Sequence, residues 1–120
     1  EFYANSSSQV NNLKINPGDS FATSVAGVKF EGRQNLIKHV HVGQQIKLIR
    51  EPENKHDNNA IKVMINENES IGYIYKGLAK KIAPIIDRDY SSGVINGEIV
   101  SIYEVKNSPS IIGVKIRFYF

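Results

Sequence analysis

The residues best suited to chemistry stand together in one run, Arg50 to Val63, which reads REPENKHDNNAIKV. Charged and polar side chains dominate its first ten positions, and the run also contains His56. Several of these side chains can form two or more hydrogen bonds at once: Arg50, Asn54, Asp57, Asn58 and Asn59. Apolar residues alternate on either side of the run, which predicts a polar loop between two strands. Loops held by rigid strands are common positions for binding residues.

Several kinds of catalytic and metal-binding chemistry lack their sequence motifs. The chain contains no Cys, which excludes a disulfide framework, Cys-ligated zinc and a cysteine nucleophile. The patterns GxSxG, GxxxxGK[ST] and HExxH are also absent. His39 and His41 could share one face of a strand, but even with Asp57 they make a weak metal site. We therefore expect no metal, no cofactor and no catalysis by this chain.

The bulk composition indicates a small globular domain. The 120 residues suit one domain, and 41% hydrophobic residues is too many for a disordered chain. A net charge of +3 permits a nucleic acid partner without requiring one. No apolar run approaches the ~20 residues of a membrane span, and no signal peptide is visible. We expect a cytoplasmic protein without a membrane partner, and a fragment or processed chain because it begins at Glu1.

The elements that must hold the polar loop are mostly strands. Residues 1–18 are rich in Asn and Ser, which predicts a flexible linker or N-terminal arm, with the domain at 19–120. Apolar alternation from Phe21 predicts a strand to Phe30, interrupted at Ala26-Gly27. Residues 32–39 predict a turn or a helix of one to two turns. Further strands are predicted at 45–49, 60–65, 70–75, 94–105 and 111–120, with turns at 66–69 and 107–110.

One segment, residues 76–87, predicts a clear helix. Leu78, Ile82, Ile85 and Ile86 recur at the spacing of a single helical face. Pro84 inside this segment indicates a kink or a restart of the helix. The predicted fold is mainly β with one or two short helices, arranged as a small six-stranded antiparallel barrel whose closure would hide the strand edges.

Over about residues 21–105 the chain resembles the HIRAN domain family, known from the N-terminal domain of helicase-like transcription factor. The matching segments are VAGVKF from Val25, GRQ from Gly32, the run from Arg50 to Val63, IGYI from Ile71, Leu78-Ala79 and Ile86-Asp87. This resemblance implies an OB-like barrel that captures single-stranded DNA at a free 3′ end. It also implies a role in DNA repair or replication-fork processing, with a helicase or nuclease domain in the same or a partner chain.

The resemblance assigns roles to residues outside the polar loop. Lys29 would face a phosphate and Phe30 would stack on a base. Tyr73 would contact the terminal nucleotide, and Arg33 and Lys76 complete this part of the DNA-binding set. Lys29 stands where the DNA-binding relative has an arginine. A lysine cannot donate the two parallel hydrogen bonds that a guanidinium can form with one phosphate.

Inside the loop, the resemblance places Asn54, His56 and Asp57 around the terminal nucleotide. Asp57 would accept a hydrogen bond from the free 3′-hydroxyl, and the same carboxylate would repel a phosphate there. His56 replaces an aromatic ring of the family with a smaller one. Proteins that bind single strands usually combine aromatic rings, which stack on bases, with basic side chains, which contact phosphates.

Each assignment has a structural alternative. Asp57 and the loop asparagines could only shape the turn, because such side chains bond their own backbone. We expect structural roles for Glu51 and Asn59, and Phe30 could belong to the core. Lys76, Lys80 and Lys81 could be a solvated face or could follow phosphates. For the whole chain, the alternative is a protein-interaction module that binds a peptide or a partner's carboxyl group through the polar loop.

Overall fold

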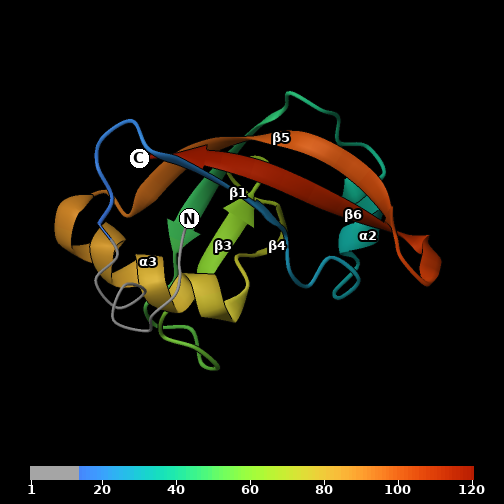
Figure 1. The fold of residues 1–120 in the computed structure, drawn as a ribbon. Helices are drawn as coiled ribbons and strands as arrows, with labels where there is room; N and C mark the ends of the chain where they lie inside the picture. Colours follow the sequence, from blue (N-terminus) through green and yellow to red (C-terminus); the bar gives the residue numbers. More distant parts are fainter. Residues whose placement is uncertain (1–13) are drawn as a thin grey trace.

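The computed structural model describes residues 14–120, which form one antiparallel sheet and two helices (Figure 1). The sheet has the strand order β1-β6-β5-β2-β3-β4. The strands are β1 Ser20–Ser24, β2 Gln45–Arg50, β3 Ile61–Met64, β4 Ser70–Tyr73, β5 Val94–Val105 and β6 Ser108–Tyr119, and the helices are α2 Arg33–Ile37 and α3 Lys76–Asp89. The predicted fold class, six antiparallel strands with two helices, is confirmed.

The sheet curls until its two edges meet at one point. Beyond β1 the chain continues to Ala26, which pairs with Tyr73 of β4 in an isolated antiparallel bridge. The Ala26 N–H donates to the Tyr73 carbonyl at 2.8 Å, and the Tyr73 N–H donates back at 3.0 Å. The sheet is therefore a curled half-barrel closed by a single bridge, rather than a barrel closed along a full strand pair.

The core fills the inside of this curl and is covered by α3. Alternate residues of the strands point inward, among them Leu48, Ile99 and Phe118, which are fully buried. On α3 the apolar face predicted from the sequence is buried as well, including Ile82 and Ile86. The helix continues through Pro84, which lies on its exposed side. The buried face extends on both sides of Pro84, so α3 is a single helix and the restart considered from the sequence does not occur.

Two sequence predictions are wrong in detail. The strand from Phe21 ends at Ser24, and residues 28–32 turn back into α2. Gly27, Glu31 and Gly32 have φ angles of 77°, 55° and 73°, and these left-handed residues turn the chain back after Ala26. The turn predicted at 107–110 is shorter, because Asn107 takes φ 67° and β6 already begins at Ser108.

The predicted N-terminal arm lies only partly within the described residues. Residues 1–13 are outside them. Of the remainder, Ile15 packs against the core, and the Gly18 N–H donates to the Phe120 carbonyl at 2.6 Å. The boundary between arm and domain at residue 18 stays a prediction.

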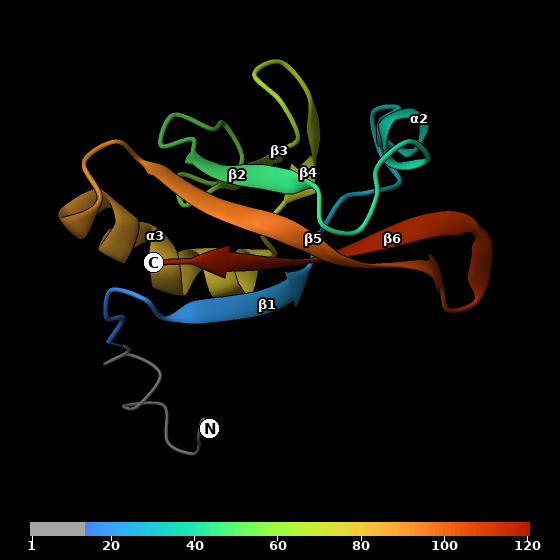
Figure 2. The same ribbon diagram turned by 90° about the horizontal axis from the view of Figure 1, so that it is seen from above.

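The two helices lie at opposite ends of the molecule. The β5–β6 hairpin extends past the other strands at the end where α2 lies, and α3 lies at the other end, near the C-terminus (Figure 2). Neither α2 nor α3 has the length and apolar character needed to cross a membrane.

Candidate functional site

The loop at residues 51–60, the end of β4 and the start of α3 form the walls of an open groove of about 320 Å³. Its lining residues are Ala26, Glu31, Asn54, His56, Asp57, Ala60, Tyr73, Ile74, Tyr75 and Lys76. Five of the eight DNA-binding candidates predicted from the sequence are in this set. The closing bridge between Ala26 and Tyr73 brings the chain after β1 to the same place, so the groove exists only in the curled sheet.

Within the polar loop, short side chains hold the backbone in shape. Asn54 Oδ1 accepts from the N–H groups of His56 at 2.9 Å and of Asp57 at 3.0 Å. Asp57 Oδ1 in turn accepts from the Asn59 N–H at 2.9 Å. No group of residues 14–120 is hydrogen-bonded to the second carboxylate oxygen of Asp57, and this residue lines the groove. Asp57 therefore shapes the loop with one oxygen and has the other available for a ligand.

Arg50 anchors the loop to α3 and does not line the groove. Its Nη1 donates to the Ala60 carbonyl at 2.8 Å and its Nη2 to the Asn58 carbonyl at 3.0 Å. Its Nε donates to Asp87 Oδ1 at 2.8 Å, and Nη2 also reaches Asp87 Oδ2 at 3.0 Å. These hydrogen bonds hold the pKa of Asp87 below its ordinary value. The guanidinium is buried, so Arg50 joins β2, the loop and the helix.

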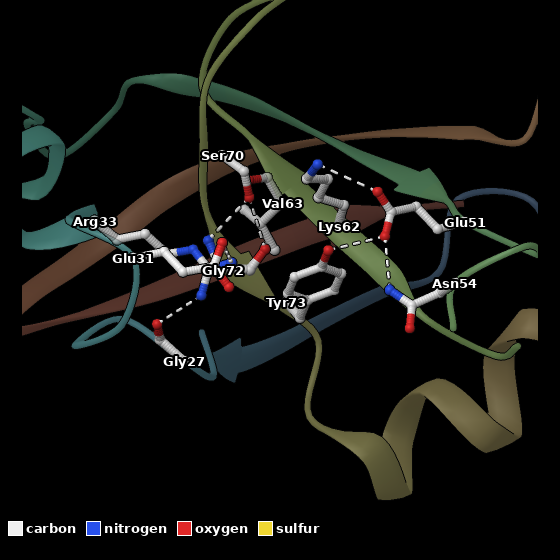
Figure 3. A network of polar contacts seen from close by, with 10 residues as sticks. All are labelled: Gly27, Glu31, Arg33, Glu51, Asn54, Lys62, Val63, Ser70, Gly72 and Tyr73. Atoms are coloured by element: carbon white, nitrogen blue, oxygen red, sulfur yellow. Dashed lines mark hydrogen bonds and ion pairs between the residues drawn. The ribbon is translucent and has the colours of Figure 1, made fainter. Parts of the chain in front are cut away.

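Glu51 connects the loop to Tyr73 (Figure 3). Its Oε1 accepts from the Tyr73 hydroxyl at 2.8 Å and from Asn54 Nδ2 at 3.0 Å. Its Oε2 lies 3.2 Å from the ammonium of Lys62. Partial burial raises the pKa of Glu51, but the hydrogen bonds from Asn54, Tyr73 and Lys62 outweigh it and lower the pKa. The structural role expected for Glu51 agrees with these contacts.

Both the hydroxyl and the ring of Tyr73 form contacts that fix its position. Burial and the hydrogen bond to Glu51 raise the pKa of Tyr73 to about 12, so the phenol stays a donor at neutral pH. The guanidinium of Arg33 lies 5.5 Å from the centre of the ring, a cation–π distance. Arg33 is itself buried and donates to the Gly27 carbonyl at 2.9 Å. Tyr73 is thus a fixed wall of the groove, and Arg33 holds the turn that carries Lys29 and Phe30.

Lys29 and Phe30 lie in that turn, next to the groove but not in its lining. The Phe30 side chain is exposed, with 57% of its surface accessible, so it is not a core residue. The ammonium of Lys29 lies 5.4 Å from the centre of the Phe30 ring. An exposed ring beside a cation suits contact with a base and its phosphate.

If Phe30 stacks on a base, as the resemblance implies, replacing it with alanine should weaken nucleic acid binding by about 1–3 kcal/mol, the usual contribution of one stacked base. The melting temperature should change little, because the ring is exposed. Titration of a fluorescent oligonucleotide and a thermal melt of the same variant test both expectations. A variant that melts far lower, yet binds normally when folded, would contradict the stacking role.

Besides three apolar residues, the groove contains two residues that were not predicted as site residues from the sequence, Glu31 and Tyr75. Tyr75 is 50% exposed and lies two positions after Tyr73. Because side chains two apart in extended chain point to the same side, the spacing of the two tyrosines was a signal for this placement. Glu31 has no such signal, since its position depends on its left-handed backbone and on its ion pair with Arg33 at 3.7 Å.

Comparisons with known proteins agree with this architecture. The sequence profile of the HIRAN domain matches residues 18–115. The crystal structure of the HIRAN domain of human HLTF has a TM-score of 0.56 and 25% identity, and the match covers 83% of this chain and 74% of that one. A crystal structure of a protein from Lactobacillus plantarum shares the fold, with a TM-score of 0.57, 19% identity, and coverage of 85% of this chain and all of that one.

Two curated relatives come from Arabidopsis thaliana. A Fanconi-associated nuclease 1 homolog is 40% identical over 73 residues, which are 61% of this chain and 8% of that protein. A putative SWI/SNF-related matrix-associated actin-dependent regulator of chromatin subfamily A member 3-like 1 is 43% identical over 44 residues, 37% of this chain and 5% of that protein. The chain therefore matches only a small part of each of these long proteins.

Proposed function

We propose that this chain, which belongs to the HIRAN domain family, is a non-catalytic module that captures single-stranded DNA at a free 3′ end. The observation that supports the proposal is the groove, which Asp57 lines together with His56, Tyr73 and Lys76, and no group of residues 14–120 is hydrogen-bonded to its second carboxylate oxygen. A terminal hydroxyl can donate to that oxygen. A continuing strand or a terminal phosphate has only acceptors and negative charge to offer at the same place.

The surroundings of Asp57 suit a nucleotide. Lys76 lines the groove and can face a phosphate, and His56 is exposed on the loop and can contact the sugar or base. Phe30 and Lys29 lie beside the groove, at the turn held by Arg33. We expect a dissociation constant in the micromolar range, about −8 kcal/mol, and weaker binding of fully blunt duplex DNA.

Asp57 variants test the proposal through a ratio of two affinities. The natural domain should prefer a 3′-hydroxyl oligonucleotide over its 3′-phosphate counterpart, and Asp57→Ala should weaken the hydroxyl ligand about tenfold, or 1.4 kcal/mol. The affinity for the 3′-phosphate oligonucleotide should fall less, or should rise, because the variant removes a negative charge that repels the phosphate. Fluorescence anisotropy with the two matched oligonucleotides measures both constants.

Asp57→Asn is the matched control for damage to the loop. Its amide oxygen can still accept the Asn59 N–H that Asp57 Oδ1 accepts now, but the negative charge is gone. Loss of the hydroxyl preference in both variants supports end capture. If Asp57→Asn keeps the natural preference, or Asp57→Ala lowers both affinities equally, Asp57 only shapes the loop and the proposal fails.

The setting of this module is part of the same proposal. The curated relatives are named as a nuclease homolog and a chromatin regulator, and the chain matches a small part of each. We infer that the domain delivers DNA ends to a helicase or nuclease domain in the same or a partner chain, in repair or fork processing. The cytoplasmic location expected from the sequence stays a prediction.

A further inference from the structure

The exposed side of α3 begins at the groove and carries three lysines. Its exposed residues in the first two turns are Lys76, Gly77, Lys80 and Lys81, and Pro84 follows on the same side. Residues three and four apart on a helix are neighbours, so these side chains form one continuous stripe. We call Lys76, Lys80 and Lys81 the lysine stripe.

The lysine stripe forms no ion pair within residues 14–120. The ion pairs of these residues join Arg33 to Glu31, Arg50 to Asp87, Lys62 to Glu51 and Arg88 to Asp89, and none includes a stripe lysine. Acidic residues appear on α3 only from Asp87 onward, where arginines pair with both carboxylates. The positive charge of α3 is thus concentrated at the end that borders the groove.

An exposed aromatic ring stands at the junction between groove and stripe. Tyr75 is half exposed, lines the groove and precedes the helix directly. A Cβ atom at Gly77 would come within 3.1 Å of Tyr75 Cε2, so the ring lies against the first turn of α3 where a glycine leaves room. Unlike Tyr73, Tyr75 forms no hydrogen bond through its hydroxyl with any residue of the described chain.

We propose that Tyr75 and the lysine stripe extend the interface beyond the captured end, with Tyr75 stacking on a base and Lys80 and Lys81 contacting phosphates of the preceding nucleotides. Continuity with the groove through Lys76 and charge complementarity to a phosphodiester backbone identify the occupant as single-stranded nucleic acid. This inference rests on the proposed function, because the strand must enter the groove before it can reach the stripe.

The test compares oligonucleotides of about 4 and about 16 nucleotides, the range of lengths that single OB-type folds cover. Replacing Lys80 and Lys81 together with glutamine should weaken the long ligand about tenfold at low salt and leave the short one unchanged. Because each phosphate contact on a single strand contributes about 0.7 to the salt slope, the slope for the long ligand should fall by about 1.4. Tyr75→Ala should weaken the long ligand, and Tyr75→Phe should bind normally.

A variant with Lys106→Gln and Lys115→Gln controls for net charge. Both residues are exposed on the β5–β6 hairpin, and Lys106 lies in its turn, at the opposite end of the molecule from α3 (Figure 2). Equal losses in the control and the Lys80/Lys81 variant would overturn the inference, as would equal losses for short and long ligands.

Failure of the inference can be told apart from failure of the proposed function. If the Lys80/Lys81 and Tyr75→Ala variants bind the long ligand normally, while Asp57→Ala still changes the hydroxyl-to-phosphate ratio, the stripe is a solvated face and end capture stands. If the unmodified domain binds neither ligand at low salt, both proposals are wrong. The hydroxyl preference itself should be the same in the stripe variants and the unmodified domain, because Asp57 is untouched.

Discussion

Replacing Gly72 with alanine should lower the free energy of unfolding by at least about 3 kcal/mol, a large share of the total for a domain of this size. Gly72 has φ 147°, which a residue with a side chain rarely adopts. An added Cβ would overlap the carbonyl oxygen of Ala26 and come within 2.7 Å of Val25 Cγ1. That carbonyl accepts the Tyr73 N–H in the bridge that closes the sheet.

Gly43→Ala is the matched control, and urea unfolding of both variants measures the difference. Gly43 also has a left-handed backbone, φ 92°, but an added Cβ there meets nothing within 4 Å. Gly43→Ala should lower the free energy of unfolding by about 1 kcal/mol, the ordinary penalty of a side chain in that conformation. Equal costs for the two variants would show that the close approach at Gly72 is unimportant for closing the sheet.

Replacing Arg50 with alanine should be the second severe change, with an expected loss of about 2–4 kcal/mol in the free energy of unfolding. The variant removes the side-chain donor of the Asn58 carbonyl and one of the two donors of the Ala60 carbonyl, which keeps the Glu51 N–H. It also removes both hydrogen bonds to Asp87. The expected loss of stability is smaller than for removing one partner of a fully buried ion pair, because about half of the Asp87 side chain is exposed. Binding should also fall, since Arg50 holds the loop that carries Asp57.

Arg88→Ala is the control for the loss of one arginine. Within residues 14–120, Arg88 pairs only with its exposed neighbour Asp89, and such surface pairs contribute little. Arg50→Lys should lie between the two, because one ammonium cannot supply the planar fork that bonds a carboxylate and two carbonyls. A melt of Arg50→Ala that coincides with that of Arg88→Ala would contradict the anchoring role.

The Arg50–Asp87 pair also predicts a dependence on pH. The pKa of Asp87 is lowered in the folded chain, so the folded state binds fewer protons than the unfolded state near the ordinary value of about 4. The contribution of the pair is complete above that pH and is lost as the pH falls through the lowered pKa. In denaturant melts between pH 7 and pH 3, the free energy of unfolding should fall less with decreasing pH for Arg50→Ala than for the unmodified domain.

Local patterns in the sequence were sufficient for the elements and for the position of the loop. The alternation around Ile46 and Leu48 and the helical spacing of Ile82 and Ile86 depend only on near neighbours, so β2 and α3 were predictable. The density of polar groups after Arg50 likewise marked the loop, because such a segment cannot be buried. The left-handed residues after Ala26 escaped prediction, since Glu31 has no tendency toward that backbone outside its turn.

Only the tertiary structure decided what each polar side chain does. In the sequence, Arg50, Glu51 and Asn54 are as well suited to bind a ligand as Asp57. In the structure they are hydrogen-bonded or ion-paired to partners within the loop, on β3, on β4 or on α3. Phe30 and Tyr75 are exposed, whereas Tyr73 is fixed by its hydrogen bond to Glu51, although the sequence predicts all three aromatic residues at strand ends. These differences come from contacts between residues that are distant in the sequence, such as the bridge of Ala26 to Tyr73 and the hydrogen bonds of Arg50 to Asp87. Contacts at such separations leave no periodic pattern in a sequence.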